Sequence, residues 1–154
     1  MDFDGVIQIK DTKNELLAER SLLFAQQAAG FTIPLPIHMM LTLSHSTIGN
    51  WTIIHVAGEV DMATGPQLRQ EIVRHVSEGN IHIVIDLQNV DFIDSTGLGI
   101  LVGGVKRARS NGGDFRCSGL SGSLQEVFSL TGLDSVLLSV DLNQDPSTWE
   151  PLNE

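Results

Sequence analysis

Apolar and polar positions change their spacing along the chain in a way that separates strands from helices. Residues 40–45 and 51–57 are rich in β-forming side chains and flank residues 46–50, whose Ser, Thr, Gly and Asn favour a turn. This arrangement predicts a β-hairpin. Residues 81–87 are almost continuously apolar, which is typical of a central strand covered on both faces. We expect two shorter strands, at residues 114–118 and 136–140.

Three segments have apolar residues at helical spacing. The first starts near Pro66, a residue suited to the first turn of a helix, and ends before the Gly-Asn pair at 79–80. The second starts near Ser95, after a short loop at residues 88–94. It has one apolar stripe, with cations in its last turn. The third helix is expected at residues 123–131.

Strands that alternate with helices predict an α/β fold. We expect a single domain over residues 39–142, with a mixed, mostly parallel sheet of four to five strands, an N-terminal hairpin and three main helices. Residues 1–38 differ from the rest and read as an extension, with a short helix at 14–29 and a proline-containing linker. Residues 143–154 are acidic and contain two prolines, which predicts a flexible tail. Met39 or Met40 would be a natural start of translation for the domain itself, without the extension.

Charge and composition narrow the partners and the compartment. The chain carries 9 Lys+Arg against 19 Asp+Glu, a formal net charge of -10. Direct nucleic-acid binding needs clustered basic residues, and an anionic membrane would repel this chain. Cys117 is the only cysteine, so an intramolecular disulfide is excluded and a buried, inert thiol is expected. The chain has no apolar run of transmembrane length and no secretory signal, so we expect a cytoplasmic protein.

The stretch from Val90 to Gly99 joins the buried strand to the second helix and carries the most informative chemistry. Ser95 falls at the helix N-terminus, as the cap or immediately beside it. One interpretation is structural: Asp94 or Ser95 is an N-cap that satisfies an orphan N–H group. The other is functional: the Ser95 hydroxyl is exposed where free N–H groups and the helix dipole stabilise a phosphate.

Three glycines in the second helix, Gly99, Gly103 and Gly104, favour the functional interpretation. Each costs about 1 kcal/mol of helix propensity relative to alanine, so a helix needed only for stability would use alanine. Gly99 and Gly103 lie one turn apart and would leave a low face beyond Ser95, which suits close approach of another protein. Tight packing of the glycines on the sheet is the alternative, and both interpretations stay open at this point.

Motifs for catalysis and metal binding are not found in the sequence. The five histidines show no metal-ligand spacing, and one cysteine cannot form a Cys-x-x-Cys site. His55 and His82 fall in strands and are expected to be satisfied sheet residues. Residues 119–123 fail the nucleophile-elbow pattern because they end in Ser123 rather than glycine. We therefore expect no catalytic residue, no metal and no cofactor.

Four blocks of the sequence together resemble the STAS domain, and more narrowly the bacterial anti-sigma factor antagonists, particularly the actinobacterial members. They are Gly-Glu-Val-Asp at 58–61, Val-Ile-Asp-Leu at 84–87, the motif at 90–99 and Leu-Thr-Gly-Leu at 130–133. Asp-Ser-Thr-Gly-Leu-Gly after a buried strand is specific when the Gly-Glu-Val-Asp block precedes it at this distance. The resemblance covers about residues 41–142.

This resemblance implies a protein-binding switch in stress-response transcription, and not an enzyme. In the family, the serine after the aspartate, here Ser95, is phosphorylated by a partner that is both anti-sigma factor and serine kinase. The unphosphorylated form binds that partner and frees a sigma factor, phosphorylation abolishes binding, and a serine phosphatase resets the switch. Thr96 ranks below Ser95 as the acceptor. The expected partner surface comprises Glu59, Asp61, Asp94, Ser95, Thr96, Gly97, Gly99 and Gly103.

Two other classes of function stay open. A structural or sensory STAS module would bind a protein or small ligand without a kinase switch. A hydrolase that uses Ser95 ranks last. Assembly into a large, kinase-independent complex would favour the scaffold module, whereas for the protein-binding switch we expect a monomer or weak dimer.

Overall fold

The hairpin predicted at the start of the domain is present. In the computed structural model, which describes residues 41–149, β1 (Leu41–Ile48) pairs antiparallel with β2 (Trp51–Val60). Its turn is the pair at 49–50 rather than the expected stretch 46–50. The turn is shorter because the two strands stay paired to the last residue of β1.

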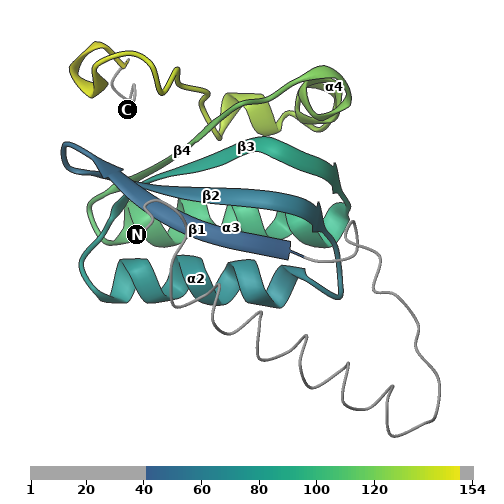
Figure 1. Cartoon of the computed structure of the whole chain (residues 1–154), viewed down its shortest axis with the longest axis horizontal. Coiled ribbons are helices and arrows are strands. Elements are labelled where there is room, and N and C mark those ends of the chain that lie inside the picture. Colours follow the sequence, from purple (N-terminus) through teal and green to yellow (C-terminus); the bar gives the residue numbers. More distant parts are fainter. Residues whose placement is uncertain (1–40, 150–154) are drawn as a thin grey trace, which may run out of the picture.

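The sheet has the strand order β1-β2-β3-β4 (Figure 1). β3 (His82–Ile93) pairs in parallel with both β2 and β4 (Asp114–Ser118), so the sheet is mixed as predicted. β3 is longer than expected, because residues 88–93 continue the strand and do not form a loop. The reason is that β2 also continues and supplies pairing partners, past two register shifts, up to Val60.

The predicted fifth strand at residues 136–140 is not formed. The chain makes a short 3₁₀ helix, Leu133–Ser135, and then meets β4 through one parallel bridge between Cys117 and Ser139. Two backbone hydrogen bonds at Cys117, of 2.9 and 2.8 Å, support the bridge. Val136 still has helical backbone angles, so the segment reaches the sheet edge too late to pair over a full strand.

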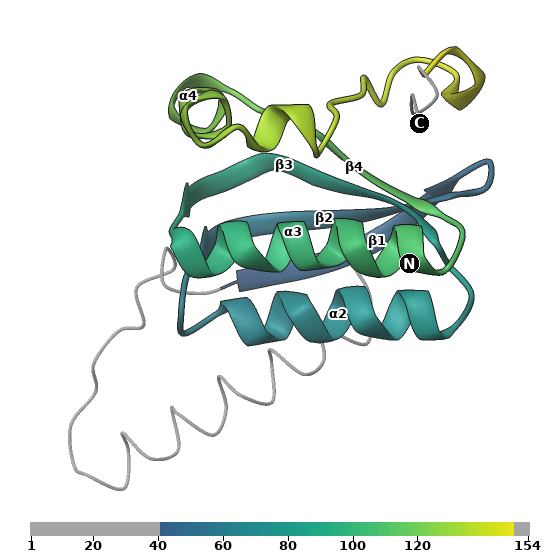
Figure 2. The same cartoon turned by 180° about the vertical axis from the view of Figure 1, so that it is seen from behind.

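The three predicted helices are present: α2 (Gly65–Ser77), α3 (Ser95–Ser110) and α4 (Gly122–Thr131). Gly132 ends α4 with a left-handed φ of 76°, as its position predicted. Figures 1 and 2 show α2 and α3 side by side along the sheet, whereas α4 and the C-terminal segment lie at the opposite end of the molecule. No helix of residues 41–149 is both long and apolar enough to cross a membrane.

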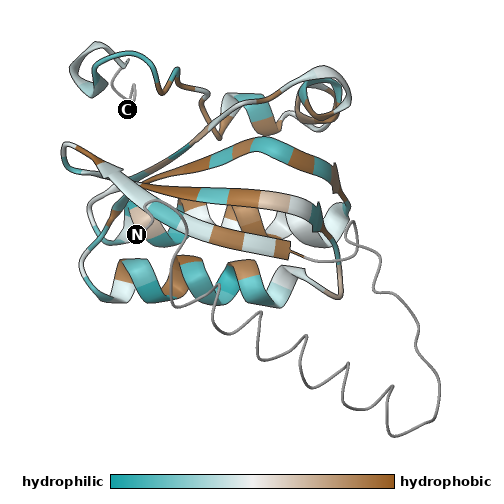
Figure 3. Cartoon of the chain, in the orientation of Figure 1, coloured by the Kyte–Doolittle hydropathy of each residue, from teal (hydrophilic) through white to brown (hydrophobic). Residues whose placement is uncertain are grey.

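Apolar side chains from all four strands and from α2, α3 and α4 form one buried cluster. Figure 3 shows the corresponding apolar bands on the strands and on the helices. Phe115 and Phe128 are among its largest fully buried members. Cys117 belongs to the same cluster, and burial raises the pKa of its thiol to about 12. The expected buried thiol is confirmed, and it stays protonated near neutral pH.

The described part of the C-terminal tail packs on the sheet, and the flexibility expected for residues 143–154 stays a prediction. A 3₁₀ helix, Pro146–Thr148, brings Trp149 onto Ile53 and Val84, where the tryptophan is 8% exposed. The indole N–H donates to the Asp141 carbonyl (3.2 Å). Burial of this one large ring opposes the fraying that an acidic composition suggests.

The expected N-terminal extension, with its helix at 14–29 and its linker, lies outside the described residues. The domain boundaries at 39 and 142 stay predictions.

Candidate functional site

Two parallel strands and two helices meet at the edge of the sheet where Ser95 lies. β3 ends at Ile93, one residue before the cap of α3, and β2 ends beside it at Val60. The Asp94 N–H donates to the Val60 carbonyl (3.1 Å), which ties the start of α3 to the end of β2. The block at 58–61 therefore lies beside Ser95, as the family resemblance implied.

Asp94, and not Ser95, is the N-cap of α3. Its carboxylate accepts a hydrogen bond from the Gly97 N–H (3.0 Å). Ser95 occupies the first helical position with an exposed side chain, and its hydroxyl has no hydrogen-bond partner in the described part of the chain. The structural and functional interpretations thus apply to different residues: Asp94 caps the helix, and Ser95 is left accessible.

Unused backbone donors surround the Ser95 side chain. The N–H groups of Gly97 and Leu98 both bond to Asp94, but residues 41–149 offer no acceptor to the N–H groups of Ser95 and Thr96. These donors and the positive end of the helix dipole stabilise a negative charge at this terminus. The local backbone therefore favours an anion attached to Ser95.

Asp61 and Thr64 shape the loop between β2 and α2, which borders the same edge. The Asp61 carboxylate accepts the N–H groups of Ala63 and Thr64 (2.9 and 3.0 Å), and the Thr64 hydroxyl donates to the Glu59 carbonyl (2.6 Å). The hydrogen bond from the Thr64 amide is the largest cause of the lowered pKa of Asp61. Asp61 therefore shapes the loop and carries a negative charge there at neutral pH.

The glycines of α3 divide into two sets by what surrounds them. A Cβ on Gly104 would lie 2.7 Å from the ring of Phe115, and a Cβ on Gly97 would lie 2.9 Å from a backbone carbonyl of β2. A Cβ on Gly99 or Gly103 would meet nothing within 4 Å. The first pair allows close packing inside the fold, and the second pair leaves open space outside it.

Gly97 differs in burial from the other residues of the predicted partner surface, and its contact with a partner stays a prediction. Gly97 is buried, because the start of α3 packs directly on the end of β2. The other residues of the predicted surface are partly or fully exposed: Glu59, Asp61, Asp94, Ser95, Thr96, Gly99 and Gly103.

A groove of about 170 Å³ runs between α2 and α3 beside the exposed glycines. Thr96, Gly99 and Gly103 line it, and the arginines Arg69 of α2 and Arg107 of α3 line it as well. The groove thus starts one residue after Ser95 and carries positive charge on an acidic protein. The two arginines could not be predicted as neighbours from the sequence, because only the packing of α2 against α3 brings them to one groove.

Two large apolar side chains stand exposed at the edge of the sheet near Ser95. Met62, in the loop after β2, is 76% exposed, and Phe92, near the end of β3, is 49% exposed. Single apolar residues of this kind give no sequence pattern, so their exposure becomes visible only in the fold. Exposed apolar side chains beside polar groups suit a protein interface.

A second polar cluster, on the β-sheet, joins Ser46, His55 and Asp86. The Ser46 hydroxyl lies 2.8 Å from Nε2 of His55, and Nδ1 of His55 lies 2.8 Å from the Asp86 carboxylate. The order of groups matches a hydrolytic triad, but such chemistry also needs a substrate cleft and donors for an oxyanion. None of the three residues lines the α2–α3 groove or the pocket discussed below. The expectation that His55 is a satisfied sheet residue is confirmed.

A third cluster, at β1 and α2, joins His45, Glu71 and His75, whose ligand-type atoms lie within 4.8 Å of one another. No sequence spacing could reveal the set, since His45 comes from a distant strand. Both carboxylate oxygens of Glu71 accept hydrogen bonds from Arg74 (2.9 and 2.8 Å), and one lies 3.1 Å from Nε2 of His75. Because the arginine already neutralises the carboxylate, we assign the cluster to buried charge pairing.

This arrangement of strands, helices and serine matches a known family. The family model described as the STAS domain matches residues 42–145. The chain belongs to the STAS domain family. The resemblance and the α/β fold class predicted from the sequence are thereby confirmed, with a sheet of four strands.

Relatives of known class lie within this family. The anti-sigma-B factor antagonist of Bacillus subtilis (strain 168) is 36% identical over 84 residues, which cover 54% of this chain and 76% of the relative. That of Staphylococcus aureus (strain NCTC 8325 / PS 47) is 31% identical over 99 residues, covering 64% and 92%. The crystal structure of an anti-sigma factor antagonist from Mycobacterium paratuberculosis matches with a TM-score of 0.63 at 28% identity, covering 72% of this chain and 93% of that chain. The relatives are thus named for antagonism of another protein and not for catalysis.

Proposed function

We propose that this STAS domain is an anti-sigma factor antagonist that is switched by phosphorylation of Ser95. The unphosphorylated form binds an anti-sigma factor that is also a serine kinase, and so frees a sigma factor. Phosphorylation abolishes this binding, and a serine phosphatase restores it. The relatives named as antagonists support the class of activity. The observation that carries the switch is the exposed Ser95 hydroxyl, which has no hydrogen-bond partner among residues 41–149, where Asp94 provides the cap.

The electrostatics of the site support a switch that acts on binding and not on folding. A phosphate on Ser95 adds about -1.5 to -2 charges near neutral pH. The free N–H groups of Ser95 and Thr96 stabilise that charge locally, so little refolding is expected. Asp94 and the loop carboxylate Asp61 already make this edge acidic. A partner that docks on the phosphorylated form must therefore bury the phosphate close to these carboxylates. Such a desolvated contact between like charges costs several kcal/mol.

The partner surface in this proposal runs from Ser95 along the α2–α3 groove. Thr96, Gly99 and Gly103 form its low part, and Glu59, Asp61 and Asp94 form its acidic edge. The openness above the two glycines supports close approach of a partner backbone. The arginines of the groove would then meet acidic groups of the partner.

We further propose that the protein acts in the cytoplasm, as a monomer or weak dimer, without a cofactor. Its formal net charge of -10 supports control of transcription through a protein partner and not through direct contact with nucleic acid.

A kinase reaction tests the site. A pull-down from a lysate of the source cells, read by mass spectrometry, supplies the partner kinase. The purified kinase and ATP should then add one phosphate to the chain, on Ser95. Ser95→Ala should keep binding and lose phosphorylation, whereas the neighbouring variant Thr96→Ala should be phosphorylated like the wild type. Full phosphorylation of Ser95→Ala at another residue would refute the site.

A sensory STAS module without a kinase switch is the second candidate function. One observation favours a ligand-binding role of this kind, namely a pocket under the C-terminal segment. Ligand binding there is compatible with the switch at Ser95, because different residues form the two sites.

A further inference from the structure

A second pocket lies on the sheet face that α2 and α3 do not cover. Phe115 of β4 faces Gly104 of α3, so its neighbour Arg116 points to the opposite face of the sheet. The C-terminal segment crosses this face and brings Trp149 against Ile53 and Val84, in a cluster separate from the main core. The pocket therefore lies on the far side of the sheet from the α2–α3 groove.

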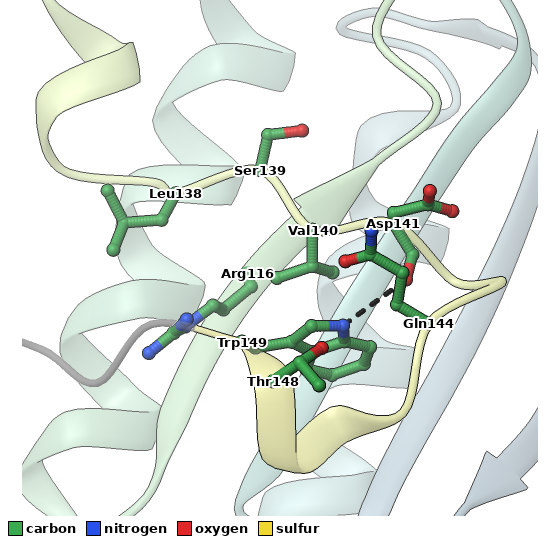
Figure 4. Close-up of a pocket in the computed structure, with 8 residues that line it drawn as sticks. All are labelled: Arg116, Leu138, Ser139, Val140, Asp141, Gln144, Thr148 and Trp149. Carbon is green, nitrogen blue, oxygen red and sulfur yellow. Dashed lines mark hydrogen bonds between the residues drawn. The ribbon is translucent and has the colours of Figure 1, made fainter.

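The pocket has a volume of about 480 Å³, within the range of about 300–1,000 Å³ that is usual for small-molecule sites. Its lining combines the strand residue Arg116 with residues of the C-terminal segment (Figure 4). In that view Arg116, Thr148 and Trp149 lie on one side of the backbone at 138–140, and the Ser139 hydroxyl points to the other side. A charged group and an aromatic wall thus share one cavity.

Arg116 is held in place and keeps donors to spare. Its side chain is 6% exposed, its Nε donates to the Asp114 carboxylate (2.7 Å), and its guanidinium lies 5.8 Å from the ring centroid of Trp51. Neither Nη atom has a hydrogen-bond acceptor among the residues that the structure describes. Among the described residues, the Ser118 hydroxyl oxygen is the only buried side-chain nitrogen or oxygen atom without a partner. The two Nη atoms, which also have no partner, are therefore in contact with solvent. An oriented arginine with two open N–H groups is suited to a carboxylate or phosphate.

Charge at the two ends of the pocket orients such an anion. The Asp114 carboxylate is shared between Arg116 and Arg109, whose Nε lies 3.5 Å from it, so one carboxylate faces two guanidinium groups. Asp141 also lines the pocket, and it accepts the Asn143 N–H (2.9 Å). Figure 4 shows its carboxylate on the far side of Trp149 from the Arg116 guanidinium. An anionic group is therefore attracted to the Arg116 end and repelled from the other.

We propose that this pocket binds a small organic anion, a carboxylate or a phosphate monoester on a compact apolar body. The anionic group pairs with the open Nη atoms of Arg116, and the apolar body lies against Trp149 and Val140. Because the wall comes from the C-terminal segment and the arginine from the sheet, the ligand holds that segment on the sheet. This site is independent of phosphorylation at Ser95.

Tryptophan fluorescence reports this binding with little background. The chain has two tryptophans and no tyrosine; Trp149 lines the pocket, and the ring centroid of Trp51 lies 5.2 Å from that of Trp149. The full chain is titrated with benzoate and with phenyl phosphate, and in parallel with inorganic phosphate and neutral benzamide. We expect a saturable change for one or both organic anions, with a Kd of about 1 mM or below, and none for benzamide. Saturation by inorganic phosphate as tight as by phenyl phosphate would overturn the role of the apolar body.

Variants decide whether the signal comes from the proposed contacts. Arg116→Gln should weaken binding by about tenfold or more, whereas Lys106→Gln, which removes an exposed cation of α3 on the other side of the sheet, should leave the Kd unchanged. In case Arg116→Gln unfolds, Thr148→Glu keeps the buried Arg116–Asp114 pair and places a carboxylate at the pocket, and it should also block binding. The proposal fails if no probe saturates, if benzamide binds as tightly as benzoate, or if folded Arg116→Gln and Thr148→Glu keep the wild-type Kd.

Discussion

Helix α3 carries glycines on two faces, and the two faces differ in what the glycines are for. On the inner face, Gly97 and Gly104 let β2 and an aromatic ring approach closer than any Cβ would permit. On the outer face, Gly99 and Gly103 border empty space. Each glycine costs about 1 kcal/mol of helix propensity relative to alanine. Packing inside the fold explains why the inner face has glycines instead of alanines. It does not explain the outer glycines, which leave room for another molecule to come close to the helix.

Ser95 lies at the head of this outer face. The groove beside the outer glycines begins at Thr96 and is also lined by Arg69 and Arg107. The inner glycines therefore serve folding, and the outer glycines are where we propose that the partner binds. The following predictions separate the two, from the largest expected effect to the smallest.

Charge at the head of the outer face should produce the largest effect. Ser95→Glu should lower the affinity for the partner kinase over 100-fold, which corresponds to roughly 3 kcal/mol, because like charges are desolvated at the interface. Calorimetric titration measures the affinity, and chemical denaturation should show nearly unchanged stability. The matched control Ser110→Glu adds the same charge at the other end of α3, on an exposed residue, and should bind normally. Equal affinity of Ser95→Glu and the wild type would remove the switch from this face.

The inner face should respond in stability. Gly104→Ala should lower the free energy of unfolding by about 1–3 kcal/mol, because its Cβ would overlap the Phe115 ring at 2.7 Å. Its neighbour on the outer face, Gly103→Ala, should raise it by up to about 1 kcal/mol, because alanine favours the helix and meets nothing. Urea denaturation of the two variants measures both signs. The same sign for both would contradict the division of α3.

Bulk on the outer face should act on binding alone. Gly99→Leu should weaken partner binding by about tenfold, or about 1.4 kcal/mol, while the thermal midpoint stays at or above that of the wild type. Titration calorimetry and a thermal melt of the same sample measure the two quantities. Normal binding by this variant would mean that the partner does not use the open space above Gly99.

The loop beside Ser95 should show the smallest effect, and one that depends on pH. The folded pKa of Asp61 lies below its ordinary value of 3.8, chiefly because the Thr64 amide donates to the carboxylate. The stabilisation is therefore complete above pH 3.8 and is lost as pH falls through the lower folded pKa. Asp61→Asn keeps an oxygen acceptor and removes the charge. Its free energy of unfolding should therefore lie below that of the wild type at neutral pH, and this difference should become smaller below pH 3.8. Denaturation curves over a pH series measure this, and a deficit that is constant across the series would contradict it.

Local signals were sufficient for the helices and for the first part of β3. Proline at the start of α2 and Gly132 after α4 act through their own backbone angles, so their effect could be predicted from the sequence. The end of β3 could not be predicted, because residues 88–93 lack an apolar run and become strand only through pairing with β2. Trp149 likewise gains its place from contact with Ile53 and Val84, which are distant in the sequence.

The residue types of the site could be predicted from the sequence. Which residue caps α3, and which glycines pack inside the fold, could not. The sequence placed Asp94 and Ser95 at a helix terminus, but only the hydrogen bond to Gly97 assigns the cap to Asp94. Helical spacing placed Gly99 and Gly103 on one face, but the sequence could not show whether that face is open or packed on the sheet. Contacts in space separate Gly104 from Gly103, although the two are adjacent along the chain.

Binding of the phosphorylated chain tests the central claim most directly. The wild type is phosphorylated on Ser95 by the purified kinase, its mass is checked, and its affinity for that kinase is compared with that of the untreated chain. The account predicts a loss of over 100-fold, roughly 3 kcal/mol, that a serine phosphatase fully reverses. Equal affinity of the two forms would contradict it.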